Sequence, residues 1–356
     1  MEQPGHGGNV WLAEQIYRIK KEHIIDFSAN INPLGPSPKA LTAIQQALPS
    51  IKHYPDPEAG GLRAAISHTI GLPEEHLIMG NGAAELIYAL GRVLRTRRVL
   101  LPVPTFSEYA GGLAGVDLVP VPLDRECDFN LQVSNIARLL QSGDLVIICN
   151  PNNPTGQLVP GDQLRWLLRR ARELGAWLMV DEAFMDFVQP EQSLLPDIPR
   201  HSNLIIVRSL TKFYALPGLR LGYLAAAPDM VQRLTDILPP WRVNTLAQVA
   251  GLASLADQAY QTSTRQIITA QREFLTRGLA QIPGLRPLPA AANFILVDCR
   301  DSGYQDRQIQ NYLGPRGILI RPCHNFAGLS HNYFRVAVRL AHENEVLLQH
   351  LRELLA

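Results

Sequence analysis

The sequence predicts an α/β protein built on a mostly parallel sheet, because apolar strand-like runs alternate with helical patterns through its middle. Leu164, Leu167, Leu168 and Ala171 recur at helical spacing between two such runs. The runs themselves are almost continuously apolar, which is typical of strands that are covered on both faces. They span residues 99–101, 118–121, 145–149, 177–180, 204–207 and 221–224.

The last third of the chain predicts a smaller α+β unit. We expect strands over 293–297, 318–320 and 333–338, and helices over 304–313 and 343–354. A proline-rich connection over 32–38 precedes an expected helix at 39–47. The expected division is a large cofactor-binding domain, residues 40–250, and a small domain formed by residues 1–39 and 251–356.

Composition excludes several classes of protein. The 356 residues are 46% hydrophobic and carry a formal net charge of +1, which gives no support for binding nucleic acid or an anionic membrane. There is no signal-peptide pattern at the N-terminus and no apolar run near the roughly 20 residues of a membrane span. The four cysteines form no CxxC pair, so we expect a cytoplasmic protein with neither disulfides nor a metal site.

The most informative segment is 209–223, SLTKFYALPGLRLGY, which directly follows the apolar run at 204–207. This places Lys212 in a loop at the carboxyl end of a strand, where open α/β sheets bind ligands. A lysine there, flanked by Ser209 and Arg220, fits an amine that forms a Schiff base with a phosphate-bearing aldehyde such as pyridoxal phosphate. The alternative is that Lys212 is a surface lysine in a basic loop. The neighbouring motifs are needed to distinguish the two interpretations.

Two loop motifs support a bound cofactor. Residues 80–85, GNGAAE, precede a helical run at 86–94, and backbone N–H groups at such a helix start can face an anion. Taken alone, this motif is more typical of an ordinary helix cap than of an anion site. Residues 150–156, NPNNPTG, form a fixed loop after a strand, and an asparagine amide there can donate to a ring hydroxyl.

Charged residues near strands supply the remaining chemistry. Asp181 ends the run at 177–180, and a buried carboxylate there needs a partner such as a protonated pyridine nitrogen. Helix capping is the alternative role. Arg321 and Arg335 lie beside or within strands, where a guanidinium is costly unless it meets an anion. That anion is either a substrate carboxylate or phosphate, or an internal Asp or Glu.

In this order, the motifs GNG, NPNNPTG, DEAF, SLTK and GLR resemble fold-type-I pyridoxal-phosphate enzymes of the aspartate aminotransferase superfamily, over essentially the whole chain. The resemblance implies that Lys212 forms the Schiff base, Asp181 faces the pyridinium nitrogen and Asn153 binds the ring O3′. It also implies a homodimer with shared active sites. The further cofactor contacts it implies are Gly82, Ala83, Ser209 and Arg220 at the phosphate, Phe106 stacked on the ring, and Tyr54 at the partner subunit's cofactor phosphate.

Within that superfamily the chain resembles histidinol-phosphate aminotransferases and, more closely, the threonine-phosphate decarboxylases of cobalamin biosynthesis. The second likeness lies in HGGN at 6–9, DFSANINP at 26–33 and DEAFMDF at 181–187. It implies decarboxylation of L-threonine O-3-phosphate, with serine phosphate as a near variant and the aminotransferase as the alternative. A regulator without catalysis is disfavoured because the catalytic positions are intact. The implied substrate contacts are His6, Gly7, Asn30, Asn153, Arg321 and Arg335. Phe184 stands where many aminotransferases carry a tyrosine, and it cannot donate to O3′.

Overall fold

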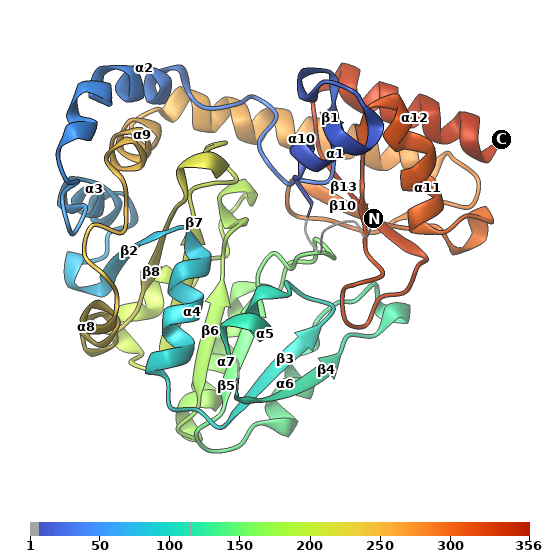
Figure 1. Cartoon of the computed structure of the whole chain (residues 1–356). Coiled ribbons are helices and arrows are strands. Elements are labelled where there is room, and N and C mark those ends of the chain that lie inside the picture. Colours follow the sequence, from blue (N-terminus) through green and yellow to red (C-terminus); the bar gives the residue numbers. More distant parts are fainter. Residues whose placement is uncertain (1–6, 114) are drawn as a thin grey trace.

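The computed structural model describes residues 7–113 and 115–356 (Figure 1). Within them, a seven-stranded sheet has the order β2–β8–β7–β6–β5–β3–β4. Neighbouring strands from β4 to β7 are parallel, whereas β8 is antiparallel to both β7 and β2. The predicted α/β fold is therefore confirmed. The strands are β2 (Leu77–Asn81), β3 (Arg98–Val103), β4 (Asp117–Pro122), β5 (Leu145–Cys149), β6 (Trp177–Asp181), β7 (Leu204–Ser209) and β8 (Leu221–Ala225).

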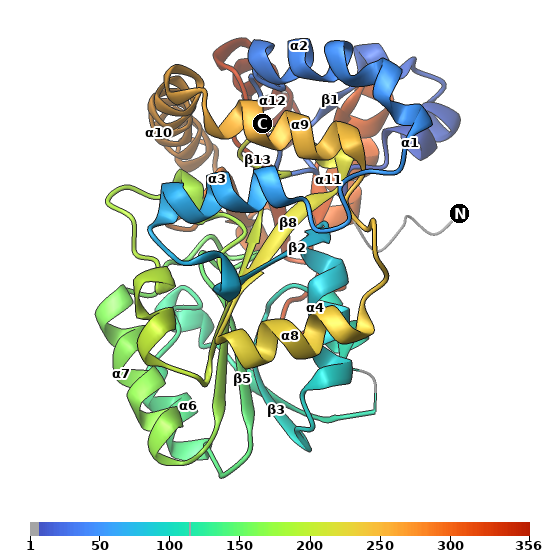
Figure 2. The same ribbon diagram turned by 90° about the vertical axis from the view of Figure 1, so that its left-hand side faces the viewer.

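Helices cover both faces of this sheet (Figure 2). One face carries α4 (Ala83–Val93), α5 (Glu108–Gly112) and α8 (Pro228–Ile237), and the other carries α6 (Val133–Leu139) and α7 (Gly161–Glu173). Successive strand residues alternate between the two layers: Ile148 packs in the core with Leu164, and Ile147 packs in the core with Leu86. Burial on both sides explains why the strands are apolar throughout.

The C-terminal third forms a four-stranded antiparallel sheet, ordered β12–β13–β10–β9, among the described residues. Strand β1 (Ile25–Asp26) pairs in parallel with β11 (Ile318–Leu319), so the N-terminal segment lies beside this part of the chain (Figure 1). The boundaries at residues 40 and 250 stay a prediction. The remaining strands are β9 (Arg286–Pro287), β10 (Phe294–Asp298), β12 (Arg321–Pro322) and β13 (Tyr333–Ala337).

Three helices pack with the small sheet in the C-terminal third of the described chain. Three others lie over the edge of the large sheet near β2 and β8 (Figure 2). The first group is α10 (Gln258–Ala280), α11 (Asp306–Leu313) and α12 (Ala341–Leu355); the second is α2 (Pro38–Ala47), α3 (Gly60–Ile70) and α9 (Thr245–Leu255). The N-terminal helix is α1 (Val10–Tyr17). None of the described helices combines the length and the apolar composition that crossing a membrane requires.

Candidate active site

The site lies where the carboxyl ends of the parallel strands meet. Cys149 at the end of β5 pairs with Asp181 at the end of β6, and Lys212 follows the end of β7 by three residues. The N-terminus of α4 comes to the same edge, as does Arg220, because β8 runs antiparallel and begins there. Together these elements enclose a cavity of about 120 Å³. Its lining contains the predicted residues Gly82, Ala83, Phe106, Asn153, Asp181, Ser209, Lys212 and Arg220.

Lys212 is held as a reactive amine. Its Nζ donates to Thr211 Oγ1 at 3.0 Å. Burial lowers the pKa of Lys212 to about 8; the positive charges of Arg220 and Arg335 act in the same direction, and Asp181 opposes them. This shift increases the fraction of free amine at neutral pH relative to an ordinary lysine, which favours a nucleophilic lysine.

Asp181 is a buried carboxylate, 4% exposed, that faces the same cavity. It accepts hydrogen bonds from the Tyr109 hydroxyl at 2.7 Å and from the Ala183 backbone N–H at 2.9 Å. Burial raises the pKa of Asp181, while these two bonds and the charge of Lys212 lower it. A ring N–H would therefore be a favourable further partner for this carboxylate. The short helix that follows, Met185–Phe187, has Phe184 and not Asp181 at its N-cap position.

Tyr109 contacts Asp181, although no pattern in the sequence singles it out. It lies in α5, fully buried, three residues after Phe106, and the two rings meet edge to face at 5.6 Å. The sequence around it identified only Phe106, because the partner of the Tyr109 hydroxyl is 72 residues away along the chain. Only the fold brings the two together.

Another group of residues in the lining of this cavity is suited to a phosphate. Gly82 has φ +80°, and a Cβ atom there would lie 2.7 Å from Arg220 Nη2, so glycine leaves the space that the guanidinium uses. The 11-residue helix α4 begins at Ala83, and its first N–H groups are available to an anion. Ser209 Oγ and Thr211 Oγ1 lie 2.7 Å apart in the same lining. An amine, a carboxylate and a cluster of anion donors thus fit the aldehyde, ring nitrogen and phosphate of pyridoxal phosphate.

A second cavity, of about 390 Å³, adjoins the first and shares Phe106, Asn153, Phe184 and Lys212 with it. Its other lining residues include the predicted substrate contacts Gly7, Asn30, Arg321 and Arg335. The fold therefore joins the predicted substrate residues to the predicted cofactor residues through a common wall.

Arg335, 5% exposed, is the central cation of this second cavity. Its guanidinium donates to Ser28 O at 2.8 Å and to Asn153 Oδ1, while its buried Nε has no hydrogen-bond partner within residues 7–113 and 115–356. Burial lowers the pKa of Arg335 to about 10. Within the described residues it forms no ion pair with a carboxylate, so the internal salt bridge that the sequence left open is not found there.

Arg321 is also buried, and it donates to Pro322 O at 2.7 Å and to Asn325 Oδ1 at 2.9 Å. Its guanidinium carbon lies 5.0 Å from the centre of the Phe326 ring. Burial lowers the pKa of Arg321, so an additional anion would stabilise its charge. Both arginines thus present positive charge to one cavity.

The N-terminal segment closes against this cavity. A Cβ atom on Gly7 would lie 2.2 Å from Ser28 O, and Gly8 N donates to Ser28 Oγ at 2.8 Å. Asn30 Oδ1 is buried and has no hydrogen-bond partner among the residues described. His6 lies outside the described residues.

Tyr54 does not line either cavity of its own chain. It is 80% exposed, and its ring stacks on Trp241 with 4.8 Å between ring centres. Its predicted contact with a partner subunit stays a prediction.

Among the residues that the structure describes, one group of side chains has the composition of a metal site. His324 Nδ1 lies 2.7 Å and His331 Nδ1 lies 3.2 Å from the carboxylate of Asp306. The same carboxylate accepts the backbone N–H groups of His324 and Arg307 at 3.0 and 2.7 Å. These four contacts engage both oxygens of the Asp306 carboxylate. We therefore interpret Asp306 as a residue that holds the segment 323–332 in place.

Comparison with known proteins agrees with this geometry. The family described as Aminotransferase class I and II matches residues 22–354. Threonine-phosphate decarboxylase from Salmonella typhimurium is 36% identical over 98% of this chain and 96% of its own, and histidinol-phosphate aminotransferase from Roseiflexus castenholzii is 37% identical over 96% and 92%. Two solved structures share the fold. They are L-threonine-O-3-phosphate decarboxylase from Porphyromonas gingivalis (TM-score 0.82, 25% identity, 92% of this chain and 98% of the other) and histidinol-phosphate aminotransferase from Sinorhizobium meliloti in complex with pyridoxal-5'-phosphate (TM-score 0.86, 26% identity, 99% and 95%).

Proposed function

Because the chain belongs to the Aminotransferase class I and II family, we propose that it is a pyridoxal-phosphate-dependent decarboxylase acting on L-threonine O-3-phosphate. The product would be (R)-1-amino-2-propanol O-2-phosphate, which would supply the aminopropanol linker of adenosylcobalamin. The observation that carries the proposal is the pair of buried arginines, Arg321 and Arg335, in one cavity with Lys212. Two cations suit a substrate that carries both a carboxylate and a phosphate. The similarity to threonine-phosphate decarboxylases adds support.

When bound, pyridoxal phosphate supplies an aldehyde for an amine and an electron-withdrawing ring that stabilises negative charge at the substrate Cα. Lys212 would provide the amine, and Asp181 would accept the ring N–H. Tyr109 holds Asp181 in place through its hydroxyl. The N-terminus of α4, with Ser209 and Arg220, would bind the phosphate.

The substrate cavity must then select which bond at Cα breaks. A bond perpendicular to the ring plane breaks most readily, so a decarboxylase has to place the carboxylate there, and an aminotransferase the hydrogen. Arg321 and Arg335 would fix the two anionic groups of the substrate and so set the rotation about Cα. Arg335 is itself fixed by Ser28 and Asn153. Lys212 lines both cavities, and in this proposal it would carry a proton to or from Cα.

Histidinol-phosphate aminotransferase is the alternative, since one relative with that name is 37% identical to this chain. Such an enzyme would bind the cofactor with the same residues, and it would require a keto acid as the acceptor of the amino group. A decarboxylase for serine phosphate differs by one methyl group in the substrate, which a pocket distinguishes by only about 1–3 kcal/mol.

The test is incubation of the holoenzyme with L-threonine O-3-phosphate and no keto acid. Sustained CO₂ release over many turnovers is expected, and the Lys212→Ala variant should release none. A reaction that stops after one half-turnover, with conversion of the cofactor to its amine form, would identify an aminotransferase. Parallel assays with serine phosphate measure the preference for the methyl group.

We further propose a homodimer in the cytoplasm, with Tyr54 reaching the cofactor phosphate of the partner subunit. The support is that Tyr54 is exposed and lines no cavity of its own chain. An exposed tyrosine stacked on another aromatic residue is well suited to burial against a second subunit.

A further inference from the structure

A buried ion pair joins the ends of the two strands that carry Asp181 and Ser209. Strands β6 and β7 are parallel neighbours, and just beyond β6 the Glu182 N–H donates to Val207 O at 2.8 Å. Arg208 Nε donates to Glu182 Oε2 at 2.9 Å, and the two side chains are 4% and 0% exposed. Glu182 directly follows Asp181, and Arg208 directly precedes Ser209. Each residue proposed to hold one end of the cofactor is thus adjacent to one member of the pair.

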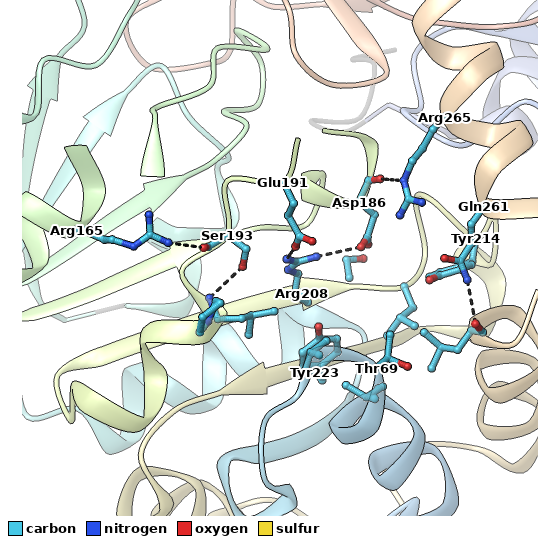
Figure 3. A pocket seen from close by; sticks show the side chains of 17 residues that line it. Thr69, Arg165, Asp186, Glu191, Ser193, Arg208, Tyr214, Tyr223, Gln261 and Arg265 are labelled. Carbon is cyan, nitrogen blue, oxygen red and sulfur yellow. Dashed lines mark hydrogen bonds and ion pairs between the residues drawn. The ribbon is translucent and has the colours of Figure 1, made fainter. Parts of the chain in front are cut away.

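The ion pair lies outside the lining of the cofactor cavity. Successive residues of a strand point to opposite faces, so Arg208 and Ser209 diverge. Ser209 lines the cofactor cavity, whereas Arg208 lines a third cavity, of about 400 Å³, that shares no residue but Ser209 with it (Figure 3). Neither Glu182 nor Arg208 is among the residues that line the cofactor cavity. Any effect of the pair on the cofactor therefore acts through the neighbouring residues.

Arg208 has one well-defined orientation. Each nitrogen of its guanidinium contacts a different carboxylate: Nε contacts Glu182, Nη1 contacts Asp186 at 3.0 Å, and Nη2 contacts Glu191. Figure 3 shows Asp186 and Glu191 directed at this group. Because the guanidinium is a rigid planar fork, three separate acceptors leave it little freedom to rotate.

Glu182 is equally constrained. Its carboxylate accepts from Ser193 Oγ at 2.6 Å and from Leu194 N at 2.9 Å, in addition to Arg208. An apolar pair of similar volume stabilises a buried position about as well as an ion pair does. The feature that an ion pair adds is direction, since its hydrogen bonds form at only one relative position of the two strand ends.

The backbone at Arg208 also lies near the helix start that is proposed to bind the cofactor phosphate. Gly222 of β8 pairs with Ser209. A Cβ atom on Gly222 would lie 2.6 Å from Ala83 N and 2.8 Å from Arg208 O. The end of β7 and the first residue of α4 are therefore in close contact, and a shift of one would displace the other.

We propose that Glu182 and Arg208 are positioning residues for the cofactor. Their ion pair fixes the spacing between Asp181, at the ring nitrogen, and Ser209, at the phosphate. Pyridoxal phosphate is a rigid ring with a short phosphate arm, so both ends are bound together only when their partners are held at one separation. This inference rests on the proposed roles of Asp181 and Ser209, and not on which substrate the enzyme uses.

The test is titration of the cofactor-free protein with pyridoxal phosphate, followed by absorbance. The double variant Glu182→Gln/Arg208→Met replaces both charges, so neither member is left as a buried charge without its partner. We expect its Kd for pyridoxal phosphate to rise at least about tenfold. With saturating cofactor, kcat should fall at least about tenfold while KM changes little, because other residues line the substrate cavity. Arg208→Lys, which keeps the charge but loses the planar fork, should change both values in the same direction.

A matched control lies at the other edge of the same sheet. Arg98, at the start of β3, donates to the buried Asp144, which precedes β5, at 2.9 and 2.6 Å. The variant Arg98→Met/Asp144→Asn makes the same kind of replacement far from the carboxyl ends of the strands. It should leave the Kd for pyridoxal phosphate and kcat unchanged, even where it lowers the urea midpoint of unfolding.

Two results would overturn the proposal. One is wild-type affinity for pyridoxal phosphate in both Glu182→Gln/Arg208→Met and Arg208→Lys. The other is an equal loss of affinity in the control variant. Urea unfolding identifies the folded variants, and Arg208→Lys alone decides if the double variant is unfolded. A wild type that bound no pyridoxal phosphate would instead refute the proposed cofactor site, so the two failures are distinguishable.

Discussion

The lowered pKa of Lys212 predicts that this lysine destabilises the cofactor-free protein. An ordinary lysine has a pKa of 10.5, and burial with nearby Arg220 and Arg335 lowers the value for Lys212 to about 8. Since one pKa unit corresponds to about 1.4 kcal/mol, the folded state bears a cost of about 3 kcal/mol at pH 7. The Lys212→Met variant, which keeps the aliphatic chain and removes the charge, should therefore be more stable by about that amount.

The sign of the pH dependence follows from the same shift. Below pH 8 the amine is charged in both the folded and the unfolded protein, so the full cost is present. Between pH 8 and 10.5 only the unfolded protein keeps the proton, so the stability of the wild type rises with pH relative to the variant. Above that range the two proteins should be equally stable.

Urea unfolding of the cofactor-free wild type and Lys212→Met, at pH 7 and at pH 10, measures this difference. The denaturant slopes of the two proteins must agree for the free energies to be compared. Lys52→Met, at an exposed position, is the control and should change stability little. If Lys212→Met were no more stable than the wild type at pH 7, the reasoning on desolvation of Lys212 would be refuted.

Three further predictions concern the active site. Asp181→Asn should lower kcat by at least about a hundredfold while the cofactor stays bound, because a neutral amide cannot stabilise a protonated ring nitrogen; unchanged kcat would contradict that role. Arg335→Lys keeps the charge but loses the planar fork, so kcat/KM for the phospho-amino acid should fall by about 10- to 100-fold; a wild-type value would remove Arg335 from the substrate site. Mixing Tyr54→Ala and Lys212→Ala subunits should restore activity that the Lys212→Ala dimer lacks, since a mixed dimer contains one intact site. No recovery after verified subunit exchange would mean that the sites are not shared.

Much of the large sheet could be predicted because its strands are buried on both faces and its helices are amphipathic. Strand β2 was not predicted: its apolar run is short, ends in the glycine-rich motif at 80–85, and gains its place only by antiparallel pairing with β8. Strands β9 and β12 were also missed, since each has only two residues and one of these is proline.

The predicted residues that line the cofactor cavity could be recognised because they follow a strand or lie at the start of a helix, and parallel strands bring their carboxyl ends to one edge. The contacts that hold these lining residues in place could not be predicted from the sequence. Tyr109 reaches Asp181, and Arg335 reaches Ser28 across 307 residues, through packing that no local pattern encodes. The role of Gly7 as a position where a side chain would collide with Ser28 is likewise visible only in the folded chain.

The charges around Lys212 connect these observations. Arg220 and Arg335 both lower the pKa of Lys212, and Asp181 is the group that raises it. Each of the two arginines also lines a cavity suited to an anion. A phosphate bound at Arg220 offsets one of these positive charges, and an anionic substrate bound at Arg335 offsets the other. The proton affinity of Lys212 should therefore rise as anions fill the two cavities.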